Sequence, residues 1–355
     1  MKKIVAALLA LLMLAVFVAC GSKPAQTTTT TPSETKTETK AEEPKKEEAK
    51  PAIDYTKKTV TVIVPFAAGG GQHVLATAVQ GCTPNVNMVI TNVTGGGGAV
   101  GIMELLNSKN DGWTVGCSTL NNVAAGAFNG AYPDPDAYKK LTMVASVAGD
   151  RMIMIANKAF MEKNGFKTLE DVVNYSKNNP DNGFKVTGAT ANSYTQAVAE
   201  LFMSKLGVKW AYVPYDGEQS ARNAIMGGDC DLCIFGVGAA QSAISGGYCT
   251  GLCLLSPERS TFFPEVPTCG EIYAELKNFD HTVYRCYYMP ENVDPAIVAE
   301  FEKILEECAK SEEFKKTCDG LFLEITYMGS AEMQAKMDQM IIDCEEMYKI
   351  MNAGK

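Results

Sequence analysis

A unit of strand, glycine-bearing loop and helix recurs in the first half of this chain and constrains the fold more than any other feature. A β-branched run over residues 59–64 ends at Pro65 and leads through the glycines at 69–71 into an apolar helical stretch. Similar units start from the strand-like segments 88–93 and 113–118. Strands that alternate with helices across short loops indicate a parallel, doubly wound sheet. In such sheets ligands bind beyond the carboxyl ends of the strands, where these loops lie.

A second set of α/β elements follows, and a helical tail ends the chain. Thr168 and Asp171 match a capping box, and Asp294 with Pro295 supplies an N-cap and a first-turn proline. Strands are predicted over 152–156, 184–187, 210–213, 231–235, 251–255 and 282–288, and helices over 168–176, 196–206, 219–226, 294–309 and 330–352. The two α/β sets and the tail predict a binding protein with two lobes.

The first twenty residues have the pattern of a secretory signal. Two lysines precede an apolar run over 4–18, which is too short for a stable membrane span, and Ala19 stands directly before Cys20. A cysteine after a small residue at this point is typical of a bacterial lipoprotein. We therefore expect an acylated Cys20 that anchors the mature chain in the lipid bilayer, at the outer, extracytoplasmic face of the cytoplasmic membrane. Ordinary cleavage, which would release a soluble protein, is the alternative.

Residues 21–54 consist largely of Thr, Pro, Glu, Lys and Ala and contain no aromatic residue. Such a segment cannot bury enough apolar surface to offset the entropy of ordering it, so a disordered tether is predicted. A flexible chain of this length would hold the globule roughly 30 Å from its anchor. The formal net charge of −9 removes the general electrostatic argument for binding nucleic acid.

The cysteines and histidines give little support to a metal site or an enzyme. Eleven of the twelve cysteines remain after Cys20, and most lie in apolar contexts typical of small buried side chains. Cys230 and Cys233 would point to opposite faces of a strand, and no second Cys or His pair accompanies them. With two histidines and no GxSxG, HExxH or Walker A motif, we expect no catalysis, no metal and no cofactor.

Six motifs occur in an order that resembles a known family. They are TVIVPFAAGGG at 61–71, Asn92 with the glycines 95–98 and Gly101, DGWT at 111–114, VPYDG at 213–217, GGDCDL at 227–232 and FPEVPT at 263–268. Together they resemble the substrate-binding proteins of tripartite tricarboxylate transporters, also called Bug-type receptors. The resemblance extends from about residue 55 to the C-terminus.

This resemblance implies an α/β, type II periplasmic-binding-protein fold in which two lobes, each with a doubly wound sheet, close on a ligand in the cleft between them. It places crossovers near 145–152 and 282–288, so that lobe 1 comprises 55–150 plus 281–355 and lobe 2 comprises 151–280. It further implies a monomer that captures a small organic carboxylate, a di- or tricarboxylate or an aromatic acid. The partner would be the permease subunits of a secondary transporter. A receptor that presents its ligand to a membrane sensor kinase is the alternative.

The resemblance and the chemistry of helix N-termini both indicate that the same two loops bind the ligand carboxylate. The family holds a carboxylate through backbone N–H groups and ordered waters, and helix N-termini offer unpaired N–H donors and a partial positive charge. The alternative is that the glycines only turn the chain. The candidate residues of these two loops are Phe66, Ala67, Ala68, Gly69, Gly70, Gly71, His73, Ser118, Thr119 and Asn121.

Two departures from the family pattern bear on the ligand. His73 and Phe235 stand where the family often has aspartates, and losing both acids removes partners for an amino group. We therefore expect a carboxylate without a nearby ammonium, with His73 donating to the anion and an apolar tail on Phe235. The alternative for His73 is a half-exposed helix residue without ligand contact.

The remaining candidates come from the second lobe and the crossovers. Arg285 is favoured as the bidentate partner of a second carboxylate because some family members carry Arg there. Arg151 is the other candidate, and for either arginine the alternative is a structural ion pair between the lobes. The full set is Arg151, Thr187, Thr190, Asn192, Ser193, Tyr194, Tyr215, Phe235, Gly236 and Arg285.

Overall fold

The computed structural model describes residues 53–179, 181 and 183–353. The expected signal segment, Cys20 and nearly all of the expected tether lie outside these residues. Within the described part of the chain, no helix combines the length and the apolar character needed to cross a membrane. All eleven cysteines of this part are unpaired thiols, and ten of them are buried.

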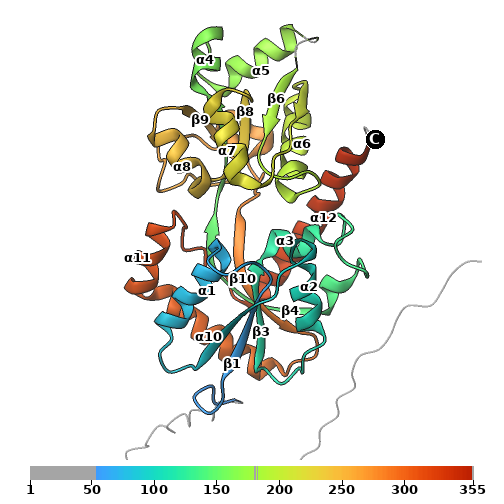
Figure 1. Cartoon of the computed structure of the whole chain (residues 1–355), viewed down its shortest axis with the longest axis vertical. Coiled ribbons are helices and arrows are strands. Elements are labelled where there is room, and N and C mark those ends of the chain that lie inside the picture. Colours follow the sequence, from blue (N-terminus) through green and yellow to red (C-terminus); the bar gives the residue numbers. More distant parts are fainter. Residues whose placement is uncertain (1–52, 180, 182, 354–355) are drawn as a thin grey trace, which may run out of the picture. The chain divides into compact units, whose positions relative to one another are not determined.

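The first lobe is built around a five-stranded sheet with the order β2-β1-β3-β10-β4 (Figure 1). Its strands are β1 (Val60–Val64), β2 (Met88–Asn92), β3 (Thr114–Thr119), β4 (Leu141–Asp150) and β10 (Val283–Pro290). β1 pairs in parallel with both β2 and β3, whereas β10 is antiparallel to both β3 and β4. The start of β10 therefore lies at the edge of the sheet where β1 and β3 end.

The second lobe repeats this arrangement with the order β7-β6-β8-β5-β9. Its strands are β5 (Met152–Asn157), β6 (Phe184–Thr187), β7 (Trp210–Tyr212), β8 (Leu232–Gly236) and β9 (Cys249–Leu254). β6 is parallel to β7 and β8, and β5 is antiparallel to β8 and β9. Each sheet thus contains one strand that runs against its neighbours, and that strand directly follows a crossover from the other lobe.

Helices cover both sheets (Figure 1). Those of the first lobe are α1 (Gly71–Cys82), α2 (Ala99–Leu106), α3 (Leu120–Ala125), α10 (Pro295–Lys310), α11 (Glu312–Gly320) and α12 (Ser330–Ala353). Those of the second lobe are α4 (Lys158–Asn164), α5 (Leu169–Asn178), α6 (Tyr194–Leu206), α7 (Gly217–Gly227), α8 (Val237–Ser245) and α9 (Cys269–Ile272). Short 3₁₀ turns lie at Gly96–Gly98, Ala137–Lys140 and Ala274–Leu276.

Two strand crossovers and the last helix join the lobes. β4 ends at Asp150 and β5 begins at Met152, so the chain passes from one sheet to the other within one residue. It returns through a segment that enters β10, where Val283 pairs with Asp150. α12 packs against β4 and α3 of the first lobe and against α6 of the second. The crossovers therefore bring the end of β4 and the start of β10 together at the junction of the lobes.

The first sheet leaves no room for a side chain at Gly116 of β3. A Cβ atom there would overlap the ring of Tyr288 and lie 2.8 Å from Leu105, and both of these side chains are buried. Gly81, near the end of α1, has open space around its Cα.

We expect Gly116→Ala to lower the free energy of unfolding by about 1–3 kcal/mol because it overpacks the core. Gly81→Ala should raise it by about 0.5–1 kcal/mol because alanine favours the helix. Urea unfolding of both variants checks this pair, and a Gly116→Ala protein as stable as Gly81→Ala would contradict the packing described.

Candidate functional site

Helix N-termini that lack a side-chain cap mark the candidate site. In seven helices a side chain accepts a hydrogen bond from the first turn; these caps are Thr119, Asn157, Thr168, Ser193, Thr268, Asp294 and Ser311. α1, α2 and α8 instead begin after Gly70, Gly98 and Gly236, with no capping side chain among the described residues and no acid in the first turn. The first N–H groups of α8 already donate, Val237 to the Arg151 carbonyl at 2.9 Å and Gly238 to Asp150. Since the first N–H groups of a helix have no intrahelical partner, the start of α1 can bind an anion.

Arg285 lies beside the N-terminus of α1. Because β10 is antiparallel, its early residue Arg285 pairs with Thr119 at the end of β3. Its Nη1 donates to Oε1 of the buried Gln72 at 3.0 Å, and a Cβ atom on Gly71 would lie 3.9 Å from the same Nη1. The side chain is 16% exposed, and its Nε is buried without a hydrogen-bond partner in the described structure. The guanidinium is thus held in place, and it still has an N–H group that can donate a hydrogen bond to a ligand.

Asp150, at the end of β4, faces Arg285. Its Oδ2 lies 4.0 Å from Arg285 Nη2, and the Gly238 N–H in the first turn of α8 donates to its Oδ1 at 3.4 Å. Any Cβ atom on Gly236 would collide with this carboxylate, which explains the glycine before α8. Burial raises the pKa of Asp150 to about 7, opposed by the charge of Arg285 and reinforced by that of Glu218.

Glu218 comes from the second lobe, in the first turn of α7. It is exposed and forms no hydrogen bond or ion pair with any described residue. The surrounding protein raises the pKa of its carboxyl, while the positive charges of Arg285 and Arg222 oppose that shift. Arg222 is directed away, because it donates to the Ala239 carbonyl at 3.3 Å and to Gln219.

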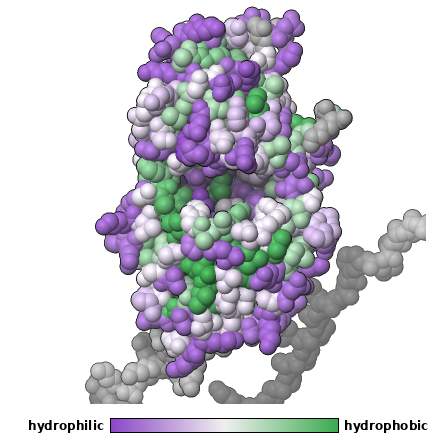
Figure 2. All heavy atoms as spheres, viewed as in Figure 1, coloured by the Kyte–Doolittle hydropathy of each residue, from purple (hydrophilic) through white to green (hydrophobic). Residues whose placement is uncertain are grey.

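We use the name interlobe cleft for the junction of the lobes at these groups: the N-terminus of α1 and Arg285 from one lobe, Asp150 at the crossover, and Glu218 with the N-terminus of α8 from the other. Figure 2 shows the surface hollowed between the lobes. This junction contains hydrogen-bond donors for an anion at the start of α1 and the carboxylate of Asp150, which accepts from the start of α8 and faces Arg285. Sequence reasoning missed Asp150 and Glu218; the only signals were their positions, at a strand end and in a helix first turn.

The structure places the expected α1 loop at the cleft but turns His73 away from it. Ala67, Ala68, Gly69 and Gly71 are exposed, and Phe66 is partly buried. His73 is partly buried, with a buried Nδ1 that has no partner among the described residues. It lines a different cavity, between α1 and α11, together with Val74, Thr77, Ala78, Gly81, Cys82, Glu313 and Thr317.

The expected residues after β3 are occupied by structural bonds. Thr119 caps α3 by accepting from the Asn122 N–H at 3.2 Å. The buried Asn121 donates to the Thr282 carbonyl and accepts from the Tyr284 N–H, both at 3.1 Å, and so fixes α3 to the start of β10. Ser118 is fully buried.

The expected polar loop of the second lobe bonds to itself and to the first lobe. Ser193 caps α6 and donates to the Thr190 carbonyl at 2.7 Å. Asn192 has a positive φ of 60° and donates to the Asn129 carbonyl of the first lobe at 3.2 Å. Thr187 is buried and donates to the Val213 carbonyl at 2.8 Å. Most of these groups are therefore already partnered.

Arg151, Phe235 and Tyr215 also have structural surroundings. Arg151 pairs with Glu324 and, at 2.9 Å, with Glu258, so it lies in an ion-pair network. Phe235 is fully buried in the core of the second lobe and offers no surface to a ligand. Tyr215 is partly buried, and its hydroxyl accepts from the Cys230 thiol at 3.9 Å.

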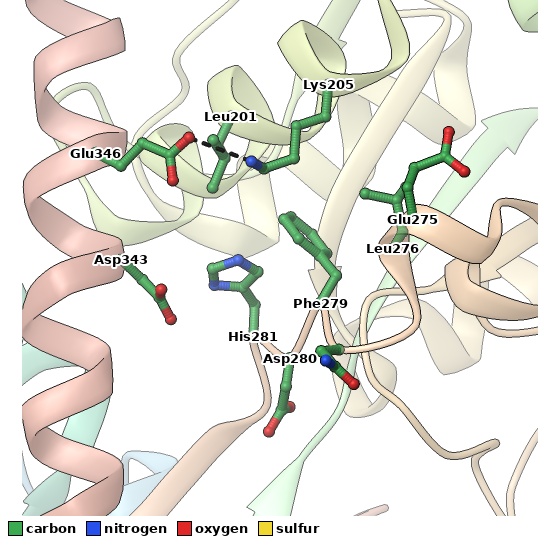
Figure 3. Close-up of a pocket in the computed structure, with 10 residues that line it drawn as sticks. Leu201, Lys205, Glu275, Leu276, Phe279, Asp280, His281, Asp343 and Glu346 are labelled. Atoms are coloured by element: carbon green, nitrogen blue, oxygen red, sulfur yellow. Dashed lines mark hydrogen bonds and ion pairs between the residues drawn. The ribbon is translucent and has the colours of Figure 1, made fainter.

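A separate cavity of about 210 Å³ lies at the junction of α6, α12 and the segment before β10 (Figure 3). Lys205 of α6 forms an ion pair of 3.2 Å with Glu346 of α12. Tyr194, another expected ligand residue, instead forms a 2.8 Å hydrogen bond with Nδ1 of His281. Burial lowers the pKa of His281 to about 4. The polar groups of this cavity thus join the last helix to the second lobe.

Comparisons with known proteins agree with this architecture. The model of the tripartite tricarboxylate transporter family receptor matches residues 84–349. The protein BugT of Bordetella pertussis is 26% identical over 264 residues, which cover 73% of this chain and 79% of BugT.

Solved structures are similar at lower identity. A TctC solute-binding protein from Polaromonas, crystallised without ligand, is 20% identical with a TM-score of 0.71, over 84% of this chain and 99% of that one. MatC from Rhodopseudomonas palustris with bound malate is 22% identical with a TM-score of 0.64, over 82% and 98%. The family predicted from the six motifs and the two-lobed fold class are confirmed.

We expect His281 to make the protein less stable in acid. In the unfolded chain the His281 imidazole takes up a proton below its ordinary pKa of 6.5. In the folded chain the same imidazole stays neutral down to about pH 4. From pH 7 to pH 5, the wild type should therefore lose about 2 kcal/mol more of its unfolding free energy than His281→Gln. Urea titrations at the two pH values measure this difference, and equal losses would contradict a buried neutral imidazole.

Proposed function

This chain belongs to the tripartite tricarboxylate transporter receptor family, and we propose that it captures a small organic carboxylate in its interlobe cleft and delivers it to the permease subunits of a secondary transporter. As members of this family are extracytoplasmic solute-binding receptors, capture would take place outside the cytoplasmic membrane. A small carboxylate is the proposed cargo because the cleft contains donors suited to an anion.

The observation that carries this proposal is the position of Arg285 at the uncapped N-terminus of α1. The N–H groups of Gly71 and Gln72 have no helical partner, and Arg285 contributes a full positive charge beside them. A carboxylate bound there would accept backbone N–H bonds and a charge-assisted bond from the guanidinium. The malate bound by MatC, a structural neighbour, supports the choice of ligand class.

The two lobes supply a mechanism of capture. We assign residues 55–150 and 281–355 to lobe 1 and 151–280 to lobe 2, with the strands on either side of Asp150 and Val283 as hinges. A ligand that touches α1 and α7 together would stabilise the closed arrangement by its higher affinity for it. The closed form of the monomer would then dock on the permease, which supplies the energy. The ligand would leave chemically unchanged.

Arg285 and Arg151 offer a matched test. Arg285→Gln should weaken carboxylate binding about 10–150-fold, because a charge-assisted hydrogen bond contributes about 1.5–3 kcal/mol. Arg151→Gln should lower the melting temperature but leave affinity within about threefold, because its partners Glu324 and Glu258 are structural. A thermal-shift screen of mono-, di- and tricarboxylates, aromatic acids and amino acids finds the ligand, and calorimetry gives the affinities. Equal loss of affinity in both variants would contradict the role of Arg285.

The lipid anchor is a further part of the proposal. Cys20 follows Ala19 at the end of the apolar run, and an acylated cysteine would hold the receptor at the outer face of the membrane. We expect Cys20→Ser to abolish incorporation of a fatty-acid label and to move the protein from the membrane fraction to the soluble fraction. Wild-type protein that takes up no label would exclude the anchor and leave the binding function intact.

A further inference from the structure

We propose that Cys82 and Cys308 form a redox-active thiol pair, in which oxidation by a small disulfide joins the end of α1 to the end of α10. The pair lies at the opposite end of α1 from the interlobe cleft, so this inference goes beyond carboxylate capture and does not depend on it. Receptors of this family are extracytoplasmic, and disulfides form and persist outside the cytoplasm.

Cys82 is the accessible thiol of the described chain. Of the eleven cysteines in this part, ten are buried and Cys82 alone is partly exposed. It is the last residue of α1 and lines two cavities: the one beside His73 and α11, and a second of about 140 Å³ between the end of α1 and α10. A water-soluble oxidant can therefore reach Cys82, whereas the other ten thiols are covered by protein.

Cys308, in the last turn of α10, is the partner that the packing gives to Cys82. Both residues line the cavity of about 140 Å³, and Cys82 packs against the core cluster that contains Cys308. The two side chains lie within hydrogen-bonding reach of each other. Cys318 of α11 belongs to the same core cluster but lines neither of the two cavities. The thiol closest to Cys82 on an accessible path is therefore that of Cys308.

Both thiols stand at helix ends, where the backbone can adjust. A disulfide requires Cα atoms separated by about 4.4–6.8 Å and a restricted dihedral angle. Cys82 ends α1, and the following Thr83 N–H donates to the Gln80 carbonyl through a long bond of 3.4 Å. Cys308 lies just before Ser311, where α10 gives way to α11. A shift confined to these two ends can bring the sulfurs together.

The reaction consists of two successive thiol–disulfide exchanges. The Cys82 thiolate attacks one sulfur of the oxidant, for instance oxidised glutathione, whose S–S bond breaks; one glutathione leaves and takes up a proton. The Cys308 thiol then loses its proton, attacks Cys82 Sγ and expels the second glutathione. The protein thus gives up two electrons and two protons, and the oxidant becomes two thiols. Burial raises the pKa of the Cys308 thiol, so Cys82 reacts first and the closing step is slower.

Cys253 and Cys269 provide an internal comparison. They flank Leu254 and Thr268, which form an isolated β-bridge, so these two thiols also lie near each other. Both residues have an exposure of 0%. Proximity without access should leave them reduced.

The experiment is oxidation of the folded full chain with oxidised glutathione, followed by alkylation of the remaining thiols and peptide mapping by mass spectrometry without reduction. Most molecules should contain a Cys82–Cys308 disulfide, whereas Cys253 and Cys269 should be alkylated only after unfolding. Cys82→Ser should remove the crosslink. Cys308→Ala should stop the reaction at a glutathione adduct on Cys82, because the second exchange then has no attacking thiol.

The crosslink should also change the stability of the protein. It closes a long loop and so restricts the unfolded chain, and the oxidised protein should melt about 5–10 °C above the reduced protein. Cys82→Ser treated in the same way should show no such rise.

Several results would overturn the pair. They are a glutathione adduct on wild-type Cys82 that does not resolve, a bond from Cys82 to Cys318, a Cys253–Cys269 disulfide that forms as readily, and a folded protein that does not react. Equal melting temperatures before and after oxidation would contradict the stabilising crosslink. Because Cys82 is partly exposed, Cys82→Ser keeps the test decisive even if Cys308→Ala does not fold.

Discussion

The antiparallel placement of β10 between β3 and β4 is the constraint on which the candidate site depends. It brings Arg285 from the returning crossover to the edge where β1 ends and α1 begins, beside Gln72 and Gly71. It also sets Val283 against Asp150, so that both crossovers meet at one point. A parallel strand in that position would carry its first residues to the opposite edge of the sheet, far from the helix N-terminus.

The polar groups of the described structure have different roles in this arrangement. Ser, Thr, Asn and Asp side chains cap seven helices, whereas α1, α2 and α8 begin at glycines without a side-chain cap among the described residues. The first N–H groups of α8 already donate to Arg151 and Asp150, and those of α1 are the donors proposed for the ligand. Asn121, Tyr194 and Arg151 connect elements across the fold. Arg285, at the junction of the lobes, keeps a buried Nε without a partner among the described residues.

The fold was largely readable from the sequence, because strand, glycine loop and helix recur and because six motifs occur in order. The short α8 was not foreseen, since Val237–Ser245 has the small residues of a loop as much as those of a helix. The loop 66–71 and Arg285 were separate candidates in the sequence, and the fold brings them together. The sequence did not indicate that the polar loop at 187–194 connects the two lobes. Its partners, Asn129, His281 and Met340, are distant in sequence, and only the tertiary fold brings them close. Asp150 and Glu218 were missed for the same reason.

The most direct measurement is a crystal structure of the protein with its bound carboxylate. The account requires the ligand carboxylate to accept hydrogen bonds from the backbone N–H groups of Gly71 and Gln72 and from the guanidinium of Arg285, with both lobes in contact with the ligand. A carboxylate bound elsewhere, for example in the cavity beside His281 and Lys205, with Arg285 still bonded only to Gln72, would contradict it.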